Sequence, residues 1–324
     1  MKFLVIQTAF IGDVVLATPV VEKLHRFFPD AAIDILVRKG NERLFDDHPF
    51  LNQVLIWDKK NGKTKNLGKL IAKVRSHQYS HVINLHRYWS SGLLAIFSGA
   101  SEKIGFDKNP LSSFYSKKIR HIFGDKANFI HEVDRNLSLI EHLTDGKTQV
   151  PVLYPRPQDF DKIKPTGKYV CIAPASVWTT KQYPLEKWKT FVDTIPNGLS
   201  VYLIGGPLDK GLCHAILSES NHPQIVNLAG QLSFLESCAL MKNAEMNYVN
   251  DSAPTHFASA VNAPVTTIYC STIPEFGFTP LSDNSIILQT KTTLNCRPCG
   301  IHGKKGCPLG HFNCADINIT PPAF

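Results

Sequence analysis

Short apolar runs alternate with amphipathic segments along most of this 324-residue chain, and this alternation constrains its fold more than any other feature. The runs are rich in β-branched residues and are typical of buried strands, whereas the segments between them repeat apolar residues with a helical period. Such alternation predicts crossover units on a parallel sheet. The elements expected in the first half are strands at 3–6, 33–37, 54–57 and 81–85, and helices at 14–28, 67–75 and 133–143.

A proline-rich segment, residues 150–157, interrupts the alternation. Its three prolines cannot continue a helix or a central strand, and the chain is too long for one typical core of about 100–200 residues. We therefore predict two α/β domains, residues 1–150 and 151–324, with ligands at the carboxyl ends of their strands, in the cleft between the domains. The elements expected after the linker are strands at 169–173, 201–204, 246–249 and 265–269, and helices at 185–193, 210–218, 234–242 and 255–261.

The chain carries a net charge of +8 and has a sequence pI near 9.0. This charge favours anionic partners such as phosphates, nucleic acid or an acidic membrane face, without selecting one of them. No run of eighteen apolar residues is present, which argues against a transmembrane helix. Asp13 interrupts the apolar N-terminal stretch and no cleavage site follows it, so we expect a cytoplasmic protein.

Two common phosphate-binding signatures are absent from the sequence, the Gly-x-Gly-x-x-Gly motif after a strand and the Walker-type motif. Their absence disfavours dehydrogenase, kinase and ATPase functions. If the protein binds a diphosphate, loops without these motifs must hold it.

The first candidate loop, residues 8–13, follows the first expected strand. Gly12 permits a tight turn, and Asp13 would place a carboxylate at the start of the next helix, facing the crevice. Asp is also a preferred helix N-cap, so the residue type allows either a catalytic or a structural role.

The second candidate loop, residues 173–184, follows the strand expected at 169–173. Its Thr179 and Thr180 hydroxyls, followed by the Lys181 ammonium, could orient and neutralise phosphate oxygens. The alternative is a polar loop with one exposed lysine.

The third candidate, residues 249–256, lies at a strand-to-helix junction. Asp251 and Ser252 are plausible caps, Pro254 suits a first helical turn, and free backbone N–H groups there form an anion site. His256 could face a ligand, or it could be a buried, hydrogen-bonded histidine.

Taken together and in this order, these segments resemble glycosyltransferase family 9, whose members include the ADP-heptose:lipopolysaccharide heptosyltransferases. The resemblance spans nearly the whole chain. It implies the GT-B fold, two facing Rossmann-like domains with the active site in the interdomain cleft, the acceptor in the first domain and the donor in the second. The segments that carry it are 11–19, 79–86, 104–106, 178–188, 227–230 and 250–256.

The resemblance also implies the chemistry. It implies an inverting, metal-independent transferase that moves a heptose or related sugar from a nucleotide-diphosphate donor, ADP-heptose, to a lipopolysaccharide core acceptor. Asp13 would be the general base, and no nucleic acid would be bound. The enzyme would work as a peripheral protein on the cytoplasmic face of the inner membrane. The donor-side positions that it implies are Gly12, Thr179, Thr180, Lys181, Asp209 near the ribose, Leu232 at the adenine, Asp251, Ser252, Ala253, Thr255 and His256.

Four of the eight cysteines cluster near the C-terminus, at Cys296, Cys299, Cys307 and Cys314. In a reducing cytoplasm this spacing favours a metal over disulfides, because four thiolates can complete a tetrahedral zinc site. A structural zinc ion is therefore one prediction. Reduced cysteines packed in a compact loop, or a disulfide formed on oxidation, are the alternatives.

Three other functions remain open at this point. The same fold could use a different nucleotide-sugar donor for another surface glycan, or the protein could bind a sugar nucleotide without catalysis. A zinc-binding nucleic-acid module would explain the cysteines but not Asp13, Lys181 or residues 251–256, and the basic patches lack interleaved aromatic residues.

Overall fold

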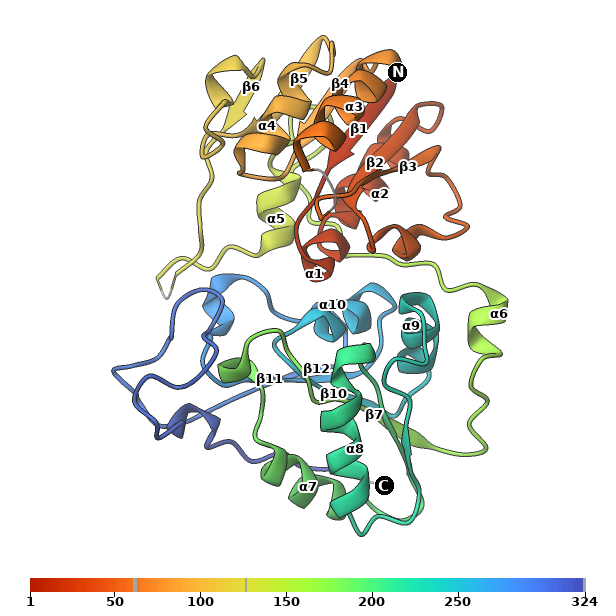
Figure 1. The fold of residues 1–324 in the computed structure, drawn as a ribbon, viewed down its shortest axis with the longest axis vertical. Helices are drawn as coiled ribbons and strands as arrows, with labels where there is room; N and C mark the ends of the chain where they lie inside the picture. Colours follow the sequence, from red (N-terminus) through yellow and green to blue (C-terminus); the bar gives the residue numbers. More distant parts are fainter. Residues whose placement is uncertain (61–62, 126, 323–324) are drawn as a thin grey trace. The chain divides into compact units, whose positions relative to one another are not determined.

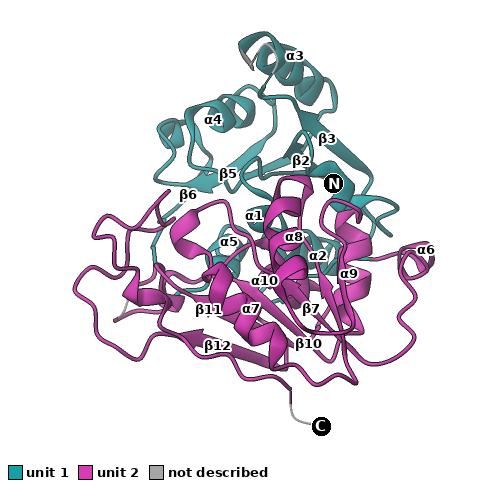
Figure 2. Cartoon of the chain, turned by 60° about the horizontal axis from the view of Figure 1, so that its bottom comes forward, with its two compact units in different colours: residues 1–123, 130–154 teal, residues 124–129, 155–324 magenta. Residues whose placement is uncertain are grey.

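A computed structural model of the chain describes residues 1–60, 63–125 and 127–322. The chain forms two compact units, coloured teal and magenta in Figure 2. Unit 1 comprises Met1–Phe123 and Ile130–Tyr154, and unit 2 comprises Gly124–Phe129 and Pro155–Phe324. The division after Tyr154 lies in the proline-rich segment.

Unit 1 is built on a six-stranded parallel sheet with the order β3-β2-β1-β4-β5-β6 (Figure 1). Val5 of β1 lies opposite Ile35 of β2 and Ile83 of β4, and all three are fully buried. Strands covered on both faces favour such continuous apolar runs. The strands are β1 Lys2–Ile6, β2 Ala32–Arg38, β3 Gln53–Trp57, β4 His81–Asn84, β5 Glu102–Phe106 and β6 Lys117–Ile119.

The helices of unit 1 pack in two pairs, α2 with α5 and α3 with α4. Apolar side chains of α3 and α4, among them Val74 and Leu94, join Trp57 and Tyr79 in one core cluster. The helices are α1 Ile11–Val15, α2 Thr18–Phe27, α3 Lys63–Ser76, α4 Trp89–Ile96 and α5 Glu132–Leu137, with the 3₁₀ turns η1 Glu42–Phe45 and η2 Ser112–Phe114.

The single helix expected at residues 14–28 is wrong, because the segment forms two helices, α1 and α2. Pro19 has no N–H to donate to the carbonyl of Val15, four residues earlier, so the helix cannot continue across this point. The Thr18 hydroxyl donates to the Val15 carbonyl instead, at 2.8 Å.

The helix expected at residues 133–143 is also shorter, since α5 ends at Leu137. Beyond it, Leu139 N–H donates to Asn136 and Ile140 N–H donates to Leu137. These bonds span three residues rather than four, so the chain continues in tight turns.

Unit 2 repeats the architecture on a second parallel sheet, with the order β12-β11-β10-β7-β8-β9. Tyr248 of β10 lies opposite Ile172 of β7 and Thr266 of β11. In both sheets the fourth strand of the unit joins the first, so the strand order is that of a Rossmann-like fold. The strands are β7 Tyr169–Ala173, β8 Ser200–Leu203, β9 Ile225–Asn227, β10 Met246–Asn250, β11 Val265–Tyr269 and β12 Ser285–Gln289.

In unit 2, α7 packs beside α8, and α9 packs beside both α6 and α10. The segment after β12 contributes to the core, because Cys314, Ala315 and Ile317 are buried with Trp188 and Phe191. The helices are α6 Pro157–Phe160, α7 Leu185–Asp193, α8 Lys210–Glu219, α9 Phe234–Lys242 and α10 Ala253–Ala260, with the 3₁₀ turns η3 Thr179–Lys181, η4 Pro207–Asp209, η5 Pro274–Phe276 and η6 Asn313–Ala315.

The predicted fold class, two α/β units with open parallel sheets, is confirmed. Within the described ranges, none of the helices is long and apolar enough to cross a membrane.

Candidate active site

The strand order of the unit 1 sheet reverses between β1 and β4, and the loops after these two strands meet there. The Thr8 hydroxyl of the first loop lies 3.3 Å from His86 Nδ1 of the second. Lys59 Nζ donates to the Thr8 carbonyl at 2.7 Å and to the Thr8 hydroxyl at 3.0 Å. Open α/β sheets bind ligands at such a switch point, so this edge is the candidate site of unit 1.

Asp13 is the third residue of α1, which begins after Phe10 as N-cap. Its Oδ2 accepts a hydrogen bond from the Phe10 N–H at 3.1 Å. The carboxylate thus stabilises the helix start from the third position, and the N-cap position expected for it is wrong. Gly12 also lies inside α1, where its carbonyl accepts the Leu16 N–H, so it does not form the expected tight turn.

Burial raises the pKa of the Asp13 carboxyl to about 7, and the charge of Glu132 adds to this effect. The Phe10 N–H and the Arg38 guanidinium oppose it. A carboxyl group that titrates near neutral pH is well matched to general-base catalysis.

Cations surround Asp13 and Thr8 on this edge. Arg38 lies over the Phe10 ring at 4.8 Å, and Lys59 lies 4.6 Å from the centroid of the Trp57 ring. Burial, with the charges of Lys59 and Arg87, lowers the pKa of His86 to about 3. His86 is therefore neutral at physiological pH.

In unit 2 the corresponding switch point lies between β7 and β10. Lys181 Nζ, in the loop after β7, pairs with Asp251 Oδ2 after β10 at 2.7 Å, and both side chains are largely buried. Asn250 also joins the two loops, because its side chain accepts the Tyr183 N–H at 2.9 Å and donates to the Pro174 carbonyl at 2.6 Å. Residues predicted on separate motifs are therefore brought together.

Thr179 and Thr180 lie in different environments despite being adjacent. Thr179 is exposed, whereas Thr180 is 2% exposed. The Thr180 oxygen accepts hydrogen bonds from the Ser271 hydroxyl at 2.9 Å and from the Lys304 N–H at 2.8 Å.

The N-terminus of α10 lies directly after Asp251. Ser252 is the N-cap in an extended conformation, its side chain does not cap the helix, and Ala253 and Pro254 after it are partly exposed. Thr255 is fully buried, and its hydroxyl donates to the Asn250 carbonyl at 3.0 Å. His256 is also buried, with its ring 6.5 Å from that of Phe278.

Asp209 and Leu232 lie further along the same sheet edge, after β8 and β9. Asp209 Oδ2 accepts the Gly206 N–H at 2.7 Å, and Leu232 is half-buried just before α9. Gly230 joins the two loops by donating its N–H to the Gly205 carbonyl at 2.8 Å. Its φ is +70° and an added Cβ would lie 2.8 Å from the Pro207 Cα, so glycine is required there.

The four clustered cysteines are not assembled into a metal site. Among the residues that the structure describes, no group of three or more His, Cys, Asp or Glu side chains could hold a metal ion. Cys296 Sγ lies 3.9 Å from His311 Nε2. Hydrogen bonds from the N–H groups of residues 312, 309, 310 and 311 lower the pKa of the Cys307 thiol, which favours its thiolate.

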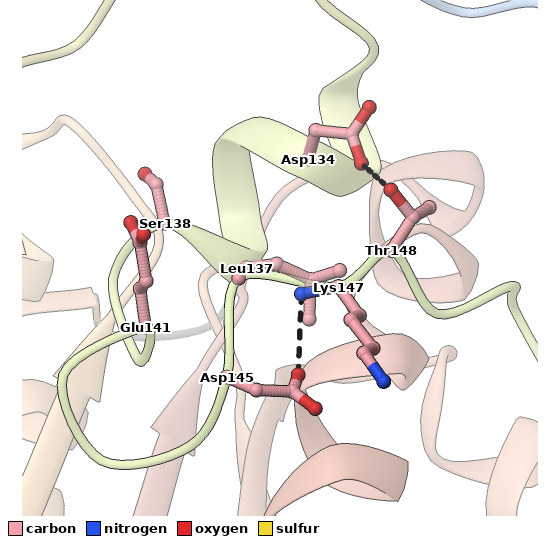
Figure 3. Close-up of a pocket in the computed structure, with 8 residues that line it drawn as sticks. Asp134, Leu137, Ser138, Glu141, Asp145, Lys147 and Thr148 are labelled. Atoms are coloured by element: carbon pink, nitrogen blue, oxygen red, sulfur yellow. Dashed lines mark hydrogen bonds between the residues drawn. The ribbon is translucent and has the colours of Figure 1, made fainter.

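A small cavity in unit 1 lies beside α5 and the loop that follows it (Figure 3). The Thr148 hydroxyl donates to Asp134 Oδ1 across it at 2.8 Å. Its volume is about 100 Å³, well below the roughly 300–1,000 Å³ of typical ligand sites. This cavity cannot hold a sugar nucleotide.

Four residues at the unit 2 site were not predicted from the sequence: Ser271, Thr272, Arg297 and Lys304. Ser271 and Thr272 follow β11, and Thr272 donates to Asp251 Oδ2 at 2.6 Å. Their place after an expected strand was a usable signal, because ligands collect at strand ends. Nothing in the local sequence links Arg297 or Lys304 to this site.

Comparison with known proteins places the chain among sugar transferases. The sequence model described as "Glycosyltransferase family 9 (heptosyltransferase)" matches residues 67–311. "Lipopolysaccharide heptosyltransferase 3" of Escherichia coli K12 is 30% identical over 291 residues, covering 85% of this chain and 84% of the relative. "Lipopolysaccharide heptosyltransferase 2" of the same strain is 24% identical over 350 residues, covering 99% and 95%.

Solved structures agree with the family match at the level of the fold. The structure of E. coli ADP-heptose lipopolysaccharide heptosyltransferase II superposes with a TM-score of 0.78 at 20% identity, covering 92% of this chain and 96% of the other. A glycosyltransferase family 9 structure from Veillonella parvula gives the same TM-score at 20% identity, covering 88% and 85%. The expected GT-B fold is therefore confirmed.

Proposed function

Because the chain belongs to glycosyltransferase family 9 and is a glycosyltransferase, we propose that it transfers a heptose from ADP-heptose to a lipopolysaccharide core acceptor. The observation that carries this proposal is the pairing of Lys181 with Asp251 at the switch point of unit 2, beside the N-terminus of α10. A cation and free backbone N–H groups at a strand edge suit a diphosphate.

On the donor side, the Lys181 ammonium and the Thr179 hydroxyl hold the diphosphate, together with the backbone N–H groups of Ser252 and Ala253, because the Thr255 N–H already donates to the Ser252 carbonyl at 3.0 Å. The partly exposed Ser252 and Ala253 are placed for this contact. Asp251 and His256 border the phosphates and the sugar. Asp209 lies toward the ribose and Leu232 toward the adenine, on the β8–β9 side of the same edge. Residues 151–324 accordingly form the donor domain.

On the acceptor side, residues 1–150 form the acceptor domain and Asp13 is the general base. The acceptor hydroxyl oxygen attacks the anomeric carbon while Asp13 takes its proton. The bond from that carbon to the diphosphate oxygen breaks, and ADP leaves with the electron pair. Attack opposite the leaving group inverts the anomeric configuration. Lys181 and the α10 N–H groups supply the charge stabilisation, so the proposed mechanism uses no metal ion.

Because the proposed acceptor carries a lipid, we propose that the enzyme acts as a peripheral protein at the cytoplasmic face of the inner membrane. Tyr88, Trp89 and Phe114 of unit 1 are 65%, 56% and 65% exposed. Asn109 ties their two segments together by donating to the Tyr88 carbonyl at 3.1 Å. Exposed Trp and Tyr side chains are favoured at membrane interfaces. Co-sedimentation with anionic vesicles tests this location, and a protein that stays in the supernatant at low salt contradicts it.

A structural zinc ion held by Cys296, Cys299, Cys307 and Cys314 is part of the proposal. The four sulfur donors suit zinc, but burial raises the pKa of the Cys299 and Cys314 thiols, and the four thiols would have to draw together to bind the ion. Elemental analysis of tag-free protein should find about one metal ion per chain, and chelation should lower the melting temperature. Metal-free protein of unchanged stability would rule the zinc site out.

The donor is tested with ADP-heptose, UDP-glucose and GDP-mannose in parallel. ADP-heptose should raise the melting temperature, because binding to the native state stabilises it by RT ln(1 + [L]/Kd). With a heptose-deficient lipopolysaccharide core it should give a product whose anomeric configuration, read by NMR, is inverted. Stabilisation and turnover with a UDP- or GDP-sugar alone would identify a different donor, and turnover with none of them would overturn the proposal.

A further inference from the structure

Residues 296–304, here called the tail loop, fold back onto the loop that carries Thr179, Thr180 and Lys181. The Thr180 N–H donates to the Lys304 carbonyl at 3.1 Å, and the Lys304 N–H donates to the Thr180 hydroxyl oxygen at 2.8 Å. The backbone of the tail loop therefore binds both polar groups of Thr180 that face it. The contact is specific to this residue, since Thr179 beside it is exposed.

Gly303 permits this close approach. Its φ is +79°, and an added Cβ would lie 3.0 Å from both the Lys181 Cγ and the Thr180 hydroxyl oxygen. A larger residue would strain the backbone and press on the two residues that follow Thr179.

Arg297 fixes the other side of the same site. Its Nε donates to the Cys270 carbonyl at 2.8 Å, and its Nη2 donates to the Thr272 carbonyl at 2.6 Å and to the Tyr269 carbonyl at 3.2 Å. One guanidinium thus holds three carbonyls of residues 269–272, at the end of β11 and directly after it. The planar donor fork of arginine allows this, and a lysine ammonium could not reproduce it.

The segment held by Arg297 contacts the donor residues directly. The Thr272 hydroxyl donates to Asp251 Oδ2 at 2.6 Å, and the same oxygen pairs with Lys181 Nζ at 2.7 Å. The Ser271 hydroxyl donates to the Thr180 oxygen at 2.9 Å. The tail loop therefore reaches Lys181 by two routes, one through Thr180 and one through Thr272 and Asp251.

We propose that Arg297 and Thr180 are positioning residues for donor binding, through which the tail loop holds Lys181 and Asp251 in the geometry that binds the diphosphate. This rests on the proposed function, because it takes Lys181 to be a phosphate ligand. Both acceptor positions of the Thr180 oxygen are occupied within the protein, so Thr180 acts through the loop rather than by contact with the donor.

The test measures the dissociation constant of ADP by titration calorimetry on the full chain, with the melting temperature of each variant alongside. Arg297→Lys and Thr180→Val should each raise the ADP dissociation constant by about tenfold, as expected when one charged ligand loses its fixed position. Thr180→Ser keeps the hydroxyl and should restore most of the affinity. Arg156→Lys is the matched control, because Arg156 makes a comparable paired contact with Asp159 in α6 and should bind ADP as wild type does.

A second measurement separates positioning from general destabilisation. If Arg297 acts through Lys181, Arg297→Lys should change ADP affinity less than twofold in a Lys181→Ala background, whereas independent effects would multiply. A tenfold loss that persists in that background overturns the proposal, as does wild-type ADP affinity in folded Thr180→Val or Arg297→Lys. If the wild-type protein does not bind ADP, the proposed ADP-sugar donor is wrong, and this result is distinct from any effect of the variants.

Discussion

The two sheets have the same strand order, yet their switch points carry opposite chemistry. In unit 1 the loop after β1 leads within a few residues to Asp13, a carboxyl group whose pKa is raised to about 7. In unit 2 the loop after β7 is longer and carries Lys181, a cation paired with Asp251. One topology therefore presents a carboxyl group of raised pKa in one unit and a lysine–aspartate ion pair in the other.

The supports of the two sites differ as well. Asp13 is held locally, by the N–H of a residue three positions earlier. Lys181 depends on segments that are distant in the sequence, at Asp251, Ser271 and the tail loop. A site held by local contacts is readable from a short motif, whereas a site held by distant segments is visible only in the fold.

The largest difference between an effect on turnover and an effect on ADP affinity is expected for Asp13→Asn. Asparagine can still accept the Phe10 N–H, but it cannot take the acceptor proton. A positioned carboxylate typically contributes about 10²–10⁴-fold, so turnover should fall at least about a hundredfold, mostly in kcat. The dissociation constant of ADP should be unchanged.

Steady-state kinetics at saturating donor and acceptor, with calorimetry for ADP, test this expectation. Near-normal turnover would show that Asp13 is not the general base and that its role is the hydrogen bond to the Phe10 N–H at the start of α1. A large loss of ADP affinity would contradict the separation of roles.

Lys181→Ala should have the complementary effect. Loss of a charge-assisted hydrogen bond costs about 1.5–3 kcal/mol, which corresponds to a roughly ten- to hundredfold weaker interaction with the diphosphate. The loss should appear in ADP affinity as well as in turnover, unlike that of Asp13→Asn. Unchanged donor KM and kcat would remove Lys181 from the phosphate site.

The sequence predicted the central strands of both sheets because they have a strong local pattern, whereas the strands β5, β6, β9 and β12 and the helix α4 were not predicted. Strands such as 169–173 and the helix at 234–242 match the structure at both ends. The single helix predicted at 14–28 is wrong because Pro19 divides it, although the apolar period continues across the proline. The helix ends near residue 137 for a different reason, since i to i−3 bonds replace helical ones there.

The candidate site was only partly predictable. Asp13, Lys181 and Asp251 follow strands and carry charge, so their positions alone indicated a site. The different surroundings of Thr179 and Thr180 could not be read from the sequence, because burial of Thr180 depends on Ser271 and Lys304. Arg297 was missed for the same reason, since its partners are backbone carbonyls, which leave no signature in the sequence.

The pH dependence of the reaction should follow Asp13. A general base must be deprotonated, so kcat/KM for the acceptor should rise about tenfold per pH unit below the pKa and level off above about 7. His86 and His48 have pKa values lowered to about 3 and about 4, so their titration falls below this range. Measuring kcat/KM from pH 5 to 9 tests this rise of activity with pH.

Glu22 provides the control for the rise of activity with pH, because burial raises its pKa to about 7 as well. Glutamine there can still accept the Tyr154 hydroxyl, whose bond to Glu22 is 2.9 Å long. Glu22→Gln should therefore keep the rise in activity through pH 7. If the rise disappears in Glu22→Gln, Asp13 is not the group that titrates.

The smallest expected effect concerns the exposed hydroxyl of Thr179, compared with Thr8 in the loop after β1 of unit 1. A neutral hydroxyl at an exposed position contributes about 0.5–1.5 kcal/mol, so Thr179→Val should raise the ADP dissociation constant about two- to tenfold. Its melting temperature should stay near that of wild type, because the Thr179 side chain is exposed. Thr8→Val makes the same chemical change at the other switch point, where the hydroxyl is bonded to Lys59, and it should lower the melting temperature and leave ADP affinity unchanged. Calorimetry and thermal unfolding of the two variants distinguish these outcomes. Two results would contradict the proposal that the Thr179 hydroxyl binds the diphosphate at the unit 2 edge. They are a raised ADP dissociation constant in Thr8→Val and an unchanged ADP dissociation constant in Thr179→Val.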